Sequence, residues 1–353
     1  MLHPRNCAAD ADDDALAVGV DLGGTKIEVS LVDRQGGVIN RIRRATRADK
    51  GPDAVIEEVI ACLTDPRLLK AASAPIGIGV GVAGQVDPET GLVRYAPNLR
   101  WHNVQLRERL QDRLAVPVEV LNDVQAVTYG EWIHGAGKGA KDLVCLFVGT
   151  GVGGGVVADG RLITGCSGNA GELGHLTIER SGPLCSCGNH GCLEALAGGW
   201  AIARRAKERI EGGGTAGDAI RRLAEAERAG EITAATVAKA YHQGDGLARE
   251  IMEDVGRALG AGIASIANAF NPAVLVLGGG VLDGLPELLD LAEREARARA
   301  LDAASRPLRI VKAELGPDAG AVGAAARIRD RILAGTHLTP TLSAGAEREG
   351  DAG

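Results

Sequence analysis

Aromatic residues are scarce in this 353-residue sequence: three Trp, three Tyr and two Phe make up 2% of it. So few rings leave little surface on which unpaired bases could stack, and a formal net charge of -7 gives no basic footprint for nucleic acid. No apolar run is long enough to span a membrane. These absences predict a soluble protein that binds neither nucleic acid nor membrane and builds its core from Ala, Val, Leu and Ile.

The amino-terminal segment, residues 1–14, is polar and acid-rich, and it lacks the apolar run of a signal peptide. We expect it to be a disordered extension. The cysteine count of seven is odd, and Cys7, Cys62, Cys145 and Cys166 are scattered along the chain. This usage is typical of the cytoplasm, where thiols stay reduced and clustered cysteines more often bind metal than form disulfides.

The other three cysteines, Cys185, Cys187 and Cys192, lie in one short segment. Three cysteines and one histidine make a four-coordinate zinc site, and we favour this interpretation over a disulfide. Two histidines are available as the fourth ligand: His190 lies inside the cysteine loop, whereas His175 comes from outside it. We favour His175, because it would tie the loop to a second segment of the chain.

Two glutamates, Glu172 and Glu194, flank the predicted zinc ligands. Neither is needed to complete a four-coordinate site. A structural metal that fixes two carboxylates in this way favours a binding site for a polyhydroxylated ligand.

Strands and helices alternate along the chain, which predicts an α/β fold. In the first part, strands are expected at 15–20, 27–32, 38–44, 75–82 and 116–121, and helices at 52–63, 104–114 and 123–133. The pattern then restarts, with strands at 142–148, 156–158, 273–277 and 308–311 and helices at 247–270, 285–300 and 319–333. The two parts form a weak internal duplication. Residues 334–353 lack periodicity and are expected to be a disordered tail.

Each part opens with a glycine-rich hairpin turn. The residues of these turns that could contact phosphate are Asp21, Gly23, Gly24, Thr25 and Lys26 in the first turn, and Thr150 and Gly151 in the second. Two such turns facing each other across a cleft can grip a polyphosphate, because backbone N–H groups in glycine turns form anion-binding concavities and Thr hydroxyls add donors. Asp21 can hold Mg²⁺ directly or through water.

Either turn alone is more simply a tight turn, and neither matches a Walker A or Rossmann pattern. A third glycine cluster, 278–280, ends a buried strand before a helix. Its bare backbone, including Gly279, suits the base and ribose of a nucleotide. Together the three clusters predict a nucleotide site.

Asn122 and Asp123 stand where a predicted strand ends and a helix begins. One interpretation is a helix N-cap, which Asn and Asp both favour. The other is a carboxylate at the carboxyl end of a strand, where open α/β sheets place their ligands. The glycine loop at 81–87 and the segment 95–101, interpreted as a polar loop with aromatics, are expected to converge on the same cleft.

Seven motifs give the chain a resemblance to a known family. They are Asp21-Leu-Gly-Gly-Thr-Lys26, Gly81-Val-Ala-Gly84, Ala96-Pro-Asn-Leu99, Asn122-Asp123, Gly149-Thr-Gly-Val-Gly-Gly-Gly155, Gly171-Glu-Leu-Gly-His175 and Cys185-Ser-Cys-Gly-Asn-His-Gly-Cys-Leu-Glu194. From about Leu16 to Leu333 the chain resembles the ROK family of repressors, open reading frames and sugar kinases. Within it, the motifs are most similar to those of bacterial ATP-dependent glucokinases.

The resemblance implies an actin-like fold with two ribonuclease-H-like α/β lobes and an active cleft between them. Residues 15–133 together with the helix 319–333 would form the small lobe. Residues 134–318, with the zinc loop, would form the large lobe. The family also implies a homodimer.

The resemblance further implies an ATP- and Mg²⁺-dependent kinase that phosphorylates a hexose, with glucose favoured over N-acetylmannosamine, N-acetylglucosamine, allose or fructose. Asp123 would be the general base that takes the proton of the sugar's primary hydroxyl. Sugar contacts would come from Gly84 (through its backbone), Asn98, Asn122, Glu172, His175 and Glu194. His175 would have two roles, with one ring nitrogen on zinc and the other toward the sugar.

The chain departs from the family pattern at Leu121, at Val124-Gln125 and at Asn169. None of these changes removes a proposed catalytic group, but they concern the pocket that selects the sugar. A repressor of the same family would carry a helix-turn-helix ahead of Asp21, where we expect no room for one, because only about twenty residues precede Asp21 and their net charge is negative and unsuited to DNA. A sugar sensor without kinase activity is the remaining alternative.

Overall fold

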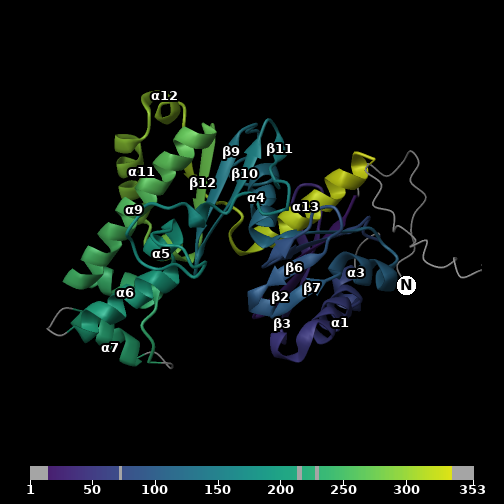
Figure 1. The fold of residues 1–353 in the computed structure, drawn as a ribbon. Helices are drawn as coiled ribbons and strands as arrows, with labels where there is room; N and C mark the ends of the chain where they lie inside the picture. Colours follow the sequence, from purple (N-terminus) through teal and green to yellow (C-terminus); the bar gives the residue numbers. More distant parts are fainter. Residues whose placement is uncertain (1–14, 71–73, 213–216, 227–229, 336–353) are drawn as a thin grey trace, which may run out of the picture.

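The computed structural model describes residues 15–70, 74–212, 217–226 and 230–335. They form two lobes, each built around a five-stranded sheet (Figure 1). The predicted extension at 1–14 and residues 336–353 of the predicted tail lie outside the described residues.

The small-lobe sheet has the strand order β3-β2-β1-β4-β8. These strands are β1 (Ala17–Leu22), β2 (Lys26–Val32), β3 (Val38–Ala45), β4 (Ile78–Val82) and β8 (Val118–Asn122). Strands β1, β2 and β3 form an antiparallel meander, whereas β4 and β8 run parallel to β1. One face packs against α1 (Gly51–Leu63), α2 (Pro66–Leu69) and α3 (Leu106–Leu114).

The other face of this sheet is covered by α13 (Ala319–Leu333), which also packs on α4 (Asp123–Ile133). The approach is close: a Cβ at Gly19 would overlap the carbonyl of Ala321, and a Cβ at Gly79 would overlap that of Ala324. This contact explains the Ala- and Gly-rich sequence of α13, because larger side chains would hold the helix away from the sheet.

The large-lobe sheet has the order β11-β10-β9-β12-β13, which is the same connectivity as in the small lobe. Its strands are β9 (Leu143–Val148), β10 (Val152–Ala158), β11 (Arg161–Leu162), β12 (Val274–Gly278) and β13 (Arg309–Lys312). Its helices are α5 (Leu193–Ala197), α6 (Gly199–Glu211), α7 (Asp218–Ala226), α8 (Ala234–His242), α9 (Gly246–Phe270), α10 (Gly280–Gly284), α11 (Glu287–Arg299) and α12 (Asp302–Ser305). The expected duplication is therefore present as two sheets of like topology.

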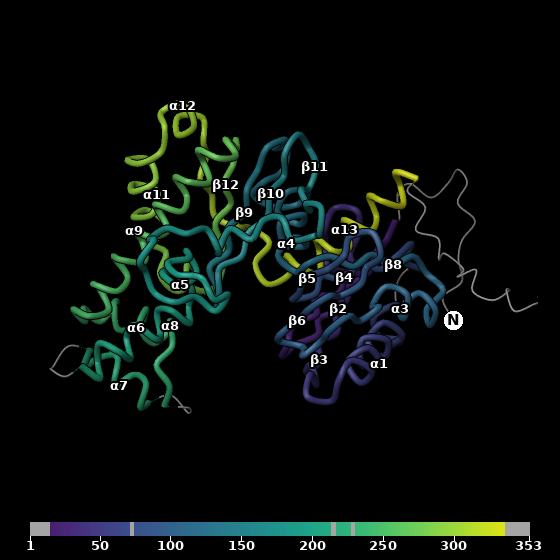
Figure 2. The backbone as a smooth tube through the Cα atoms, viewed as in Figure 1, coloured from purple at the N-terminus to yellow at the C-terminus, as the bar shows by residue number. Residues whose placement is uncertain are grey.

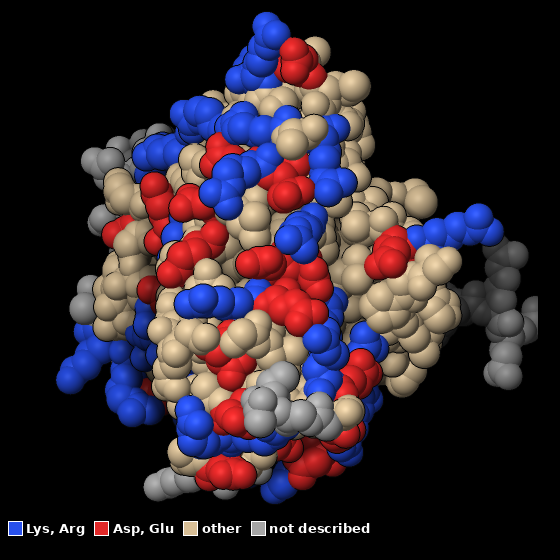
Figure 3. All heavy atoms as spheres, turned by 90° about the vertical axis from the view of Figure 1, so that its left-hand side faces the viewer, with Lys and Arg blue, Asp and Glu red and all other residues tan. Residues whose placement is uncertain are grey.

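The outer face of the large lobe carries charges of both signs side by side (Figure 3). Many are paired one helical turn apart, such as Arg297 with Glu293 and Arg299 with Glu295 on α11. Interspersed charge of this kind is a solvated face. None of the described helices is long and apolar enough to cross a membrane.

Two local expectations are wrong. The turn expected between the strands at 142–148 and 156–158 is shorter than predicted, because residues 153–155 belong to strand β10 and pair with residues 145–147 of β9. They are glycines for packing reasons: a Cβ at Gly154 would press on Leu173, and one at Gly155 on Thr128 of α4. The segment 95–101 is not a loop either.

That segment belongs to a small antiparallel sheet of β5 (Gln85–Val86), β6 (Val93–Ala96) and β7 (Trp101–Val104), with a 3-10 turn at Pro97–Leu99. Trp101 is fully buried, so this aromatic ring builds the core instead of a polar loop. Because β7 extends to Val104, helix α3 begins at Leu106 rather than at Val104.

The chain passes between the lobes twice, after α4 and before α13 (Figure 2). The fully buried carboxylate of Glu131 joins the two passages. One of its oxygens accepts the N–H of Ala136 at 3.0 Å, and the other accepts the N–H of Leu315 at 2.9 Å. The two segments that pass between the lobes are thus held together, even though they are far apart in sequence.

Candidate active site between the lobes

Residues from both lobes line a cavity of about 510 Å³. It contains all seven residues for which the sequence predicts sugar contacts: Gly84, Asn98, Asn122, Asp123, Glu172, His175 and Glu194. It also contains Gln85 and Tyr95, from the segments 81–87 and 95–101 that were expected to converge here, and Phe147 and Gly168, whose place in the pocket the sequence does not reveal. The departures Val124, Gln125 and Asn169 lie there too. The structure therefore gathers motifs that are up to 110 positions apart into one polar hollow.

Asn122 caps helix α4. Its side-chain oxygen accepts the N–H groups of Val124 at 2.9 Å and Gln125 at 3.1 Å. Its amide nitrogen donates to the carbonyl of Gly84 at 3.1 Å. The cap interpretation is confirmed for Asn122, and the same side chain also fixes the Gly84 loop of the cavity wall.

Asp123 is the first residue of α4 and lies at the carboxyl end of β8. Burial raises the pKa of its carboxyl group, while the N–H of Val124, which donates at 2.9 Å, opposes the rise. A carboxyl group with a raised pKa can take up a proton closer to neutral pH than an exposed Asp can.

Asp21 stands at the end of β1, below the first glycine turn. Burial raises its pKa to about 6, Lys26 opposes this rise, and the charge of Asp123 adds to it. Burial also raises the pKa of Glu172, to which Asp123 again contributes. The charge of Asp123 therefore acts on carboxyl groups on both sides of the cleft.

The first turn is held from the small lobe. Thr46 donates its N–H to the carbonyl of Thr25 at 2.9 Å and its hydroxyl to the carbonyl of Gly23 at 2.7 Å. A Cβ at Gly24 would lie 2.7 Å from Cβ of Asn98, so the turn touches the wall of the 510 Å³ cavity. Lys26 places its ammonium 3.9 Å from Asp21 and 2.9 Å from the buried Glu28.

The second turn, residues 149–151, lies at the start of α6. The first N–H groups of that helix are used by the turn: Gly199 donates to the carbonyl of Gly149 at 2.9 Å, and Trp200 donates to that of Thr150 at 3.0 Å. Gly149 lines the 510 Å³ cavity and also a second, larger one.

This second cavity has a volume of about 950 Å³ and lies between α6, α8 and α10. Its walls include the small and apolar residues Ala203, Ile232, Ala234, Ala238, Gly280 and Val281 and the basic residues Arg204, Lys207, Lys239 and His242. Gly279, just before α10, has φ of 101°, a conformation that favours glycine. Sequence reasoning found this glycine but missed α6, whose residues at 200, 203, 204 and 207 face the cavity with helical spacing.

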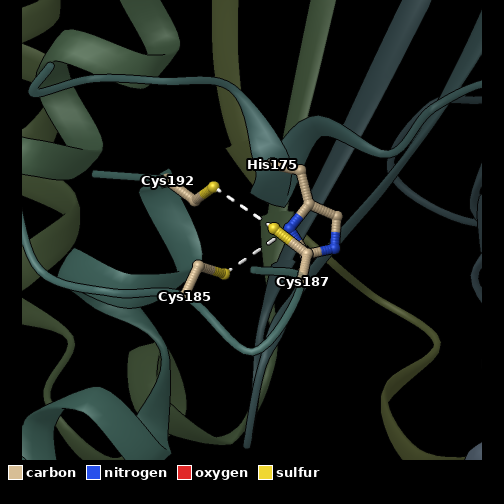
Figure 4. Close-up of side chains that lie close together, drawn as sticks. All are labelled: His175, Cys185, Cys187 and Cys192. Carbon is tan, nitrogen blue, oxygen red and sulfur yellow. Dashed lines mark hydrogen bonds between the residues drawn. The ribbon is translucent and has the colours of Figure 1, made fainter. Parts of the chain in front are cut away.

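The predicted metal ligands His175, Cys185, Cys187 and Cys192 lie together, with their ligand atoms within 4.8 Å of one another (Figure 4). The sulfurs of Cys187 and Cys192 are 3.7 Å apart, as are Cys185 Sγ and His175 Nδ1. Tetrahedral zinc with bonds of about 2.3 Å to sulfur requires neighbouring sulfurs about 3.8 Å apart. The donor set and its spacing fit zinc.

His190, the alternative fourth ligand, points elsewhere. Its Nδ1 lies 3.0 Å from the carbonyl of Gly182 and its side chain is exposed. His175 instead directs Nδ1 toward the sulfurs, and its Nε2 lies 4.0 Å from a carboxylate oxygen of Glu172. One ring therefore touches both the cysteine cluster and the sugar-facing wall.

Comparison with known proteins places this geometry in context. A model of the ROK family matches residues 17–331. A glucokinase of Streptomyces coelicolor is 33% identical over 90% of this chain and 99% of its own. The crystal structure of a ROK family glucokinase from Streptomyces griseus in complex with glucose and AMPPNP has 34% identity and a TM-score of 0.76, covering 89% of this chain and 99% of that one. An N-acetylglucosamine repressor of Escherichia coli is 32% identical over 92% of this chain but only 78% of its own.

Proposed function

The chain belongs to the ROK family and is a sugar kinase, and on that premise we propose that it transfers the γ-phosphoryl group of ATP to the 6-hydroxyl of glucose. One observation carries the proposal. The residues expected to hold a sugar line a cavity that meets, at Gly149, a second cavity large enough for a nucleoside. An acceptor and a donor can therefore approach each other at the second glycine turn.

In this proposal Asp123 is the general base. Its carboxylate takes the proton from the 6-hydroxyl while that oxygen bonds to the γ-phosphorus and the bond to the β-phosphate oxygen breaks, releasing ADP. General-base catalysis contributes about 10²–10⁴-fold, and positioning and charge neutralisation supply much of the rest. The raised pKa of Asp123 suits a group that must both take and return a proton.

The hydroxyl groups of the sugar would be held by Asn98, Asn122, Glu172, His175 and Glu194, together with the backbone of Gly84. The set contains both donors and acceptors, which suits a ligand whose hydroxyl groups both donate and accept. His175 would contact the sugar through Nε2, because Nδ1 faces the cysteine sulfurs.

The phosphates of the donor would lie between the two turns, near Gly23, Gly24, Thr25 and Lys26 on one side and Thr150 and Gly151 on the other. The nucleoside would occupy the 950 Å³ cavity, past Gly279. Asp21 would hold Mg²⁺, which neutralises phosphate charge when bound. Zinc at the cysteine cluster would be structural and would fix the loop that carries His175 and Glu194.

We further assign residues 15–133 and 319–333 to one rigid lobe and 134–318 to the other, and we expect the two to close on the sugar. Closure would exclude water and prevent wasteful hydrolysis of ATP. Scattering profiles that are identical with and without sugar would contradict closure. A homodimer is proposed on the family resemblance, and sedimentation tests it.

The choice of sugar is tested by a panel. ATP turnover should be measured with glucose, mannose, fructose, N-acetylglucosamine and N-acetylmannosamine, because Val124, Gln125 and Asn169 line the pocket and depart from the family pattern. We expect glucose to give the highest kcat/KM. If only N-acetylmannosamine is phosphorylated, it replaces glucose as the proposed substrate. If folded, zinc-loaded protein phosphorylates no sugar, the kinase proposal is wrong.

A further inference from the structure

Glu194 makes two contacts that a purely sugar-binding residue does not need. One oxygen accepts the N–H of Val152 at 2.9 Å, directly after the second glycine turn. The other accepts the hydroxyl of Ser186 at 2.9 Å. Ser186 stands between Cys185 and Cys187 in the cysteine cluster. A single carboxylate therefore joins the metal loop to the turn.

The turn packs directly on this carboxylate. A Cβ at Gly151 would overlap a carboxylate oxygen of Glu194, and a Cβ at Gly198 would lie 3.2 Å from both Glu194 Cγ and the carbonyl of Thr150. The carboxylate of Glu194 thus fills the space that a side chain on Gly151 would need. Its rotamer and the shape of the turn are set together.

Helix α6 makes a second connection between the cysteine cluster and the glycine turn at 149–151. Trp200, whose N–H donates to Thr150, packs its ring against Cys185 and Cys192. The guanidinium of Arg204 lies over this ring, 4.9 Å from its centre, and donates to the carbonyl of Leu184 at 3.2 Å. Both side chains line the 950 Å³ cavity. The cysteine cluster thus supports the donor side of the cleft as well as the sugar side.

From these contacts we infer that Ser186 and Glu194 are positioning residues for the phosphoryl donor, through which the cysteine cluster sets the conformation of residues 149–151. The inference rests on the proposed role of this turn as a phosphate site. The hydroxyl of Ser186 holds the carboxylate in the rotamer that bonds Val152. Without that hydroxyl the carboxylate turns toward water and the turn loses a support, although all four zinc ligands remain.

The test is Ser186→Ala in the full-length, zinc-loaded protein, with Ser186→Thr as the matched control that keeps a hydroxyl. Calorimetry should measure the Kd of AMPPNP with Mg²⁺ and, separately, the Kd of glucose. Loss of one partly exposed hydrogen bond to a carboxylate should weaken AMPPNP binding about 3- to 10-fold. Zinc content should stay at the wild-type value, glucose affinity should fall less than AMPPNP affinity because other residues also hold the sugar, and Thr should restore donor binding.

The possible outcomes separate this inference from the proposed function. If Ser186→Ala binds AMPPNP as the wild type does, and the protein phosphorylates glucose, the positioning role of Ser186 and Glu194 is overturned and the proposed function is not. Weakened glucose binding with unchanged AMPPNP binding also overturns it and leaves Glu194 with its sugar contact alone. Equal weakening in the Thr variant shows that bulk, and not the hydroxyl, matters. A wild-type protein that binds no AMPPNP overturns both.

Discussion

The two glycine turns occupy equivalent places in two sheets of the same strand order, yet they are charged and supported differently. The first carries its own charges, Asp21 and Lys26. The second has none, and the carboxylate that packs against it comes from Glu194, 42 positions beyond Val152. The duplicated hairpin preserves a backbone shape that suits phosphate, whereas the charges around it are supplied by whichever element lies nearest.

The supports differ as well. The first turn is fixed by Thr46 and touches the sugar wall at Asn98. The second turn is fixed by α6 and by Glu194, and through them by the cysteine cluster. Damage to the two turns should therefore have separable effects, which can be ranked from the largest to the smallest.

The largest effect is expected from Asp123→Asn, which removes the proposed general base. We expect kcat to fall by about 10²–10⁴-fold, because the proton acceptor is lost while the N-terminal position on α4 is kept. The Kd values of glucose and AMPPNP should change little. Steady-state kinetics and calorimetry measure both quantities, and a kcat close to that of the wild type would remove Asp123 from the mechanism.

The same carboxyl group predicts a pH profile. Burial raises the pKa of Asp123, and the group acts as a base only when it is ionised. The value of kcat/KM should therefore be low at acid pH and rise as the pH passes through a pKa that is higher than that of an ordinary Asp. A profile that is flat down to the usual Asp range would contradict this assignment.

Removing zinc should affect the second turn and spare the first. Cys187→Ser should lower metal affinity and raise KM for ATP and glucose by about 10-fold or more, and it should also lower Tm. Cys166→Ser is the matched control, because Cys166 is exposed and lies outside the cluster. Zinc content, Tm and kinetics of both variants are the measurements. If the zinc-free protein keeps the wild-type KM for ATP, the cysteine cluster does not support the second turn, and the proposed difference between the turns is wrong.

Asp21→Asn tests the charge that only the first turn possesses. A folded-state pKa of about 6, against an ordinary 3.8, means that ionised Asp21 costs stability above pH 6, and that this cost vanishes below pH 3.8. The variant should be more stable than the wild type at pH 7.5 by up to about 3 kcal/mol and should show no gain at acid pH. Urea unfolding at both pH values measures this.

The same variant should lose activity, because Mg²⁺ would lose a carboxylate ligand. We expect the Mg²⁺ concentration needed for half-maximal turnover to rise about 10-fold or more, with zinc content unchanged. If the variant is more stable than the wild type but its Mg²⁺ dependence is unchanged, the buried carboxylate of Asp21 does not serve as a metal ligand.

The difference between the turns also explains what the sequence could predict. The sequence alone predicts the first hairpin, Asp21 within it and the cap at Asn122, because the signals for these features are local. The pairing of Glu172 with Glu194 was predicted from the metal ligands between them, and the segment 95–101 was expected at the same cleft, whereas the individual sugar contact of Asn98 followed only from the family resemblance.

Other features could not be predicted because they depend on contacts far apart in sequence. The two bonds of Glu194 and the cavity between α6, α8 and α10 are of this kind. The sheet of β5, β6 and β7 was missed because its strands have at most four residues, too few for a clear alternation.

The smallest and most local test compares two glycines of the second turn. A Cβ at Gly149 would meet nothing within 4 Å, whereas one at Gly151 would overlap Glu194. Gly149→Ala should therefore leave Tm unchanged and weaken AMPPNP binding by a few-fold only if a phosphate passes over it. Gly151→Ala should lower Tm as well, because Glu194 must move. If Gly149→Ala binds AMPPNP as the wild type does, the donor does not cross this turn, and the likeness of the two turns is one of shape alone.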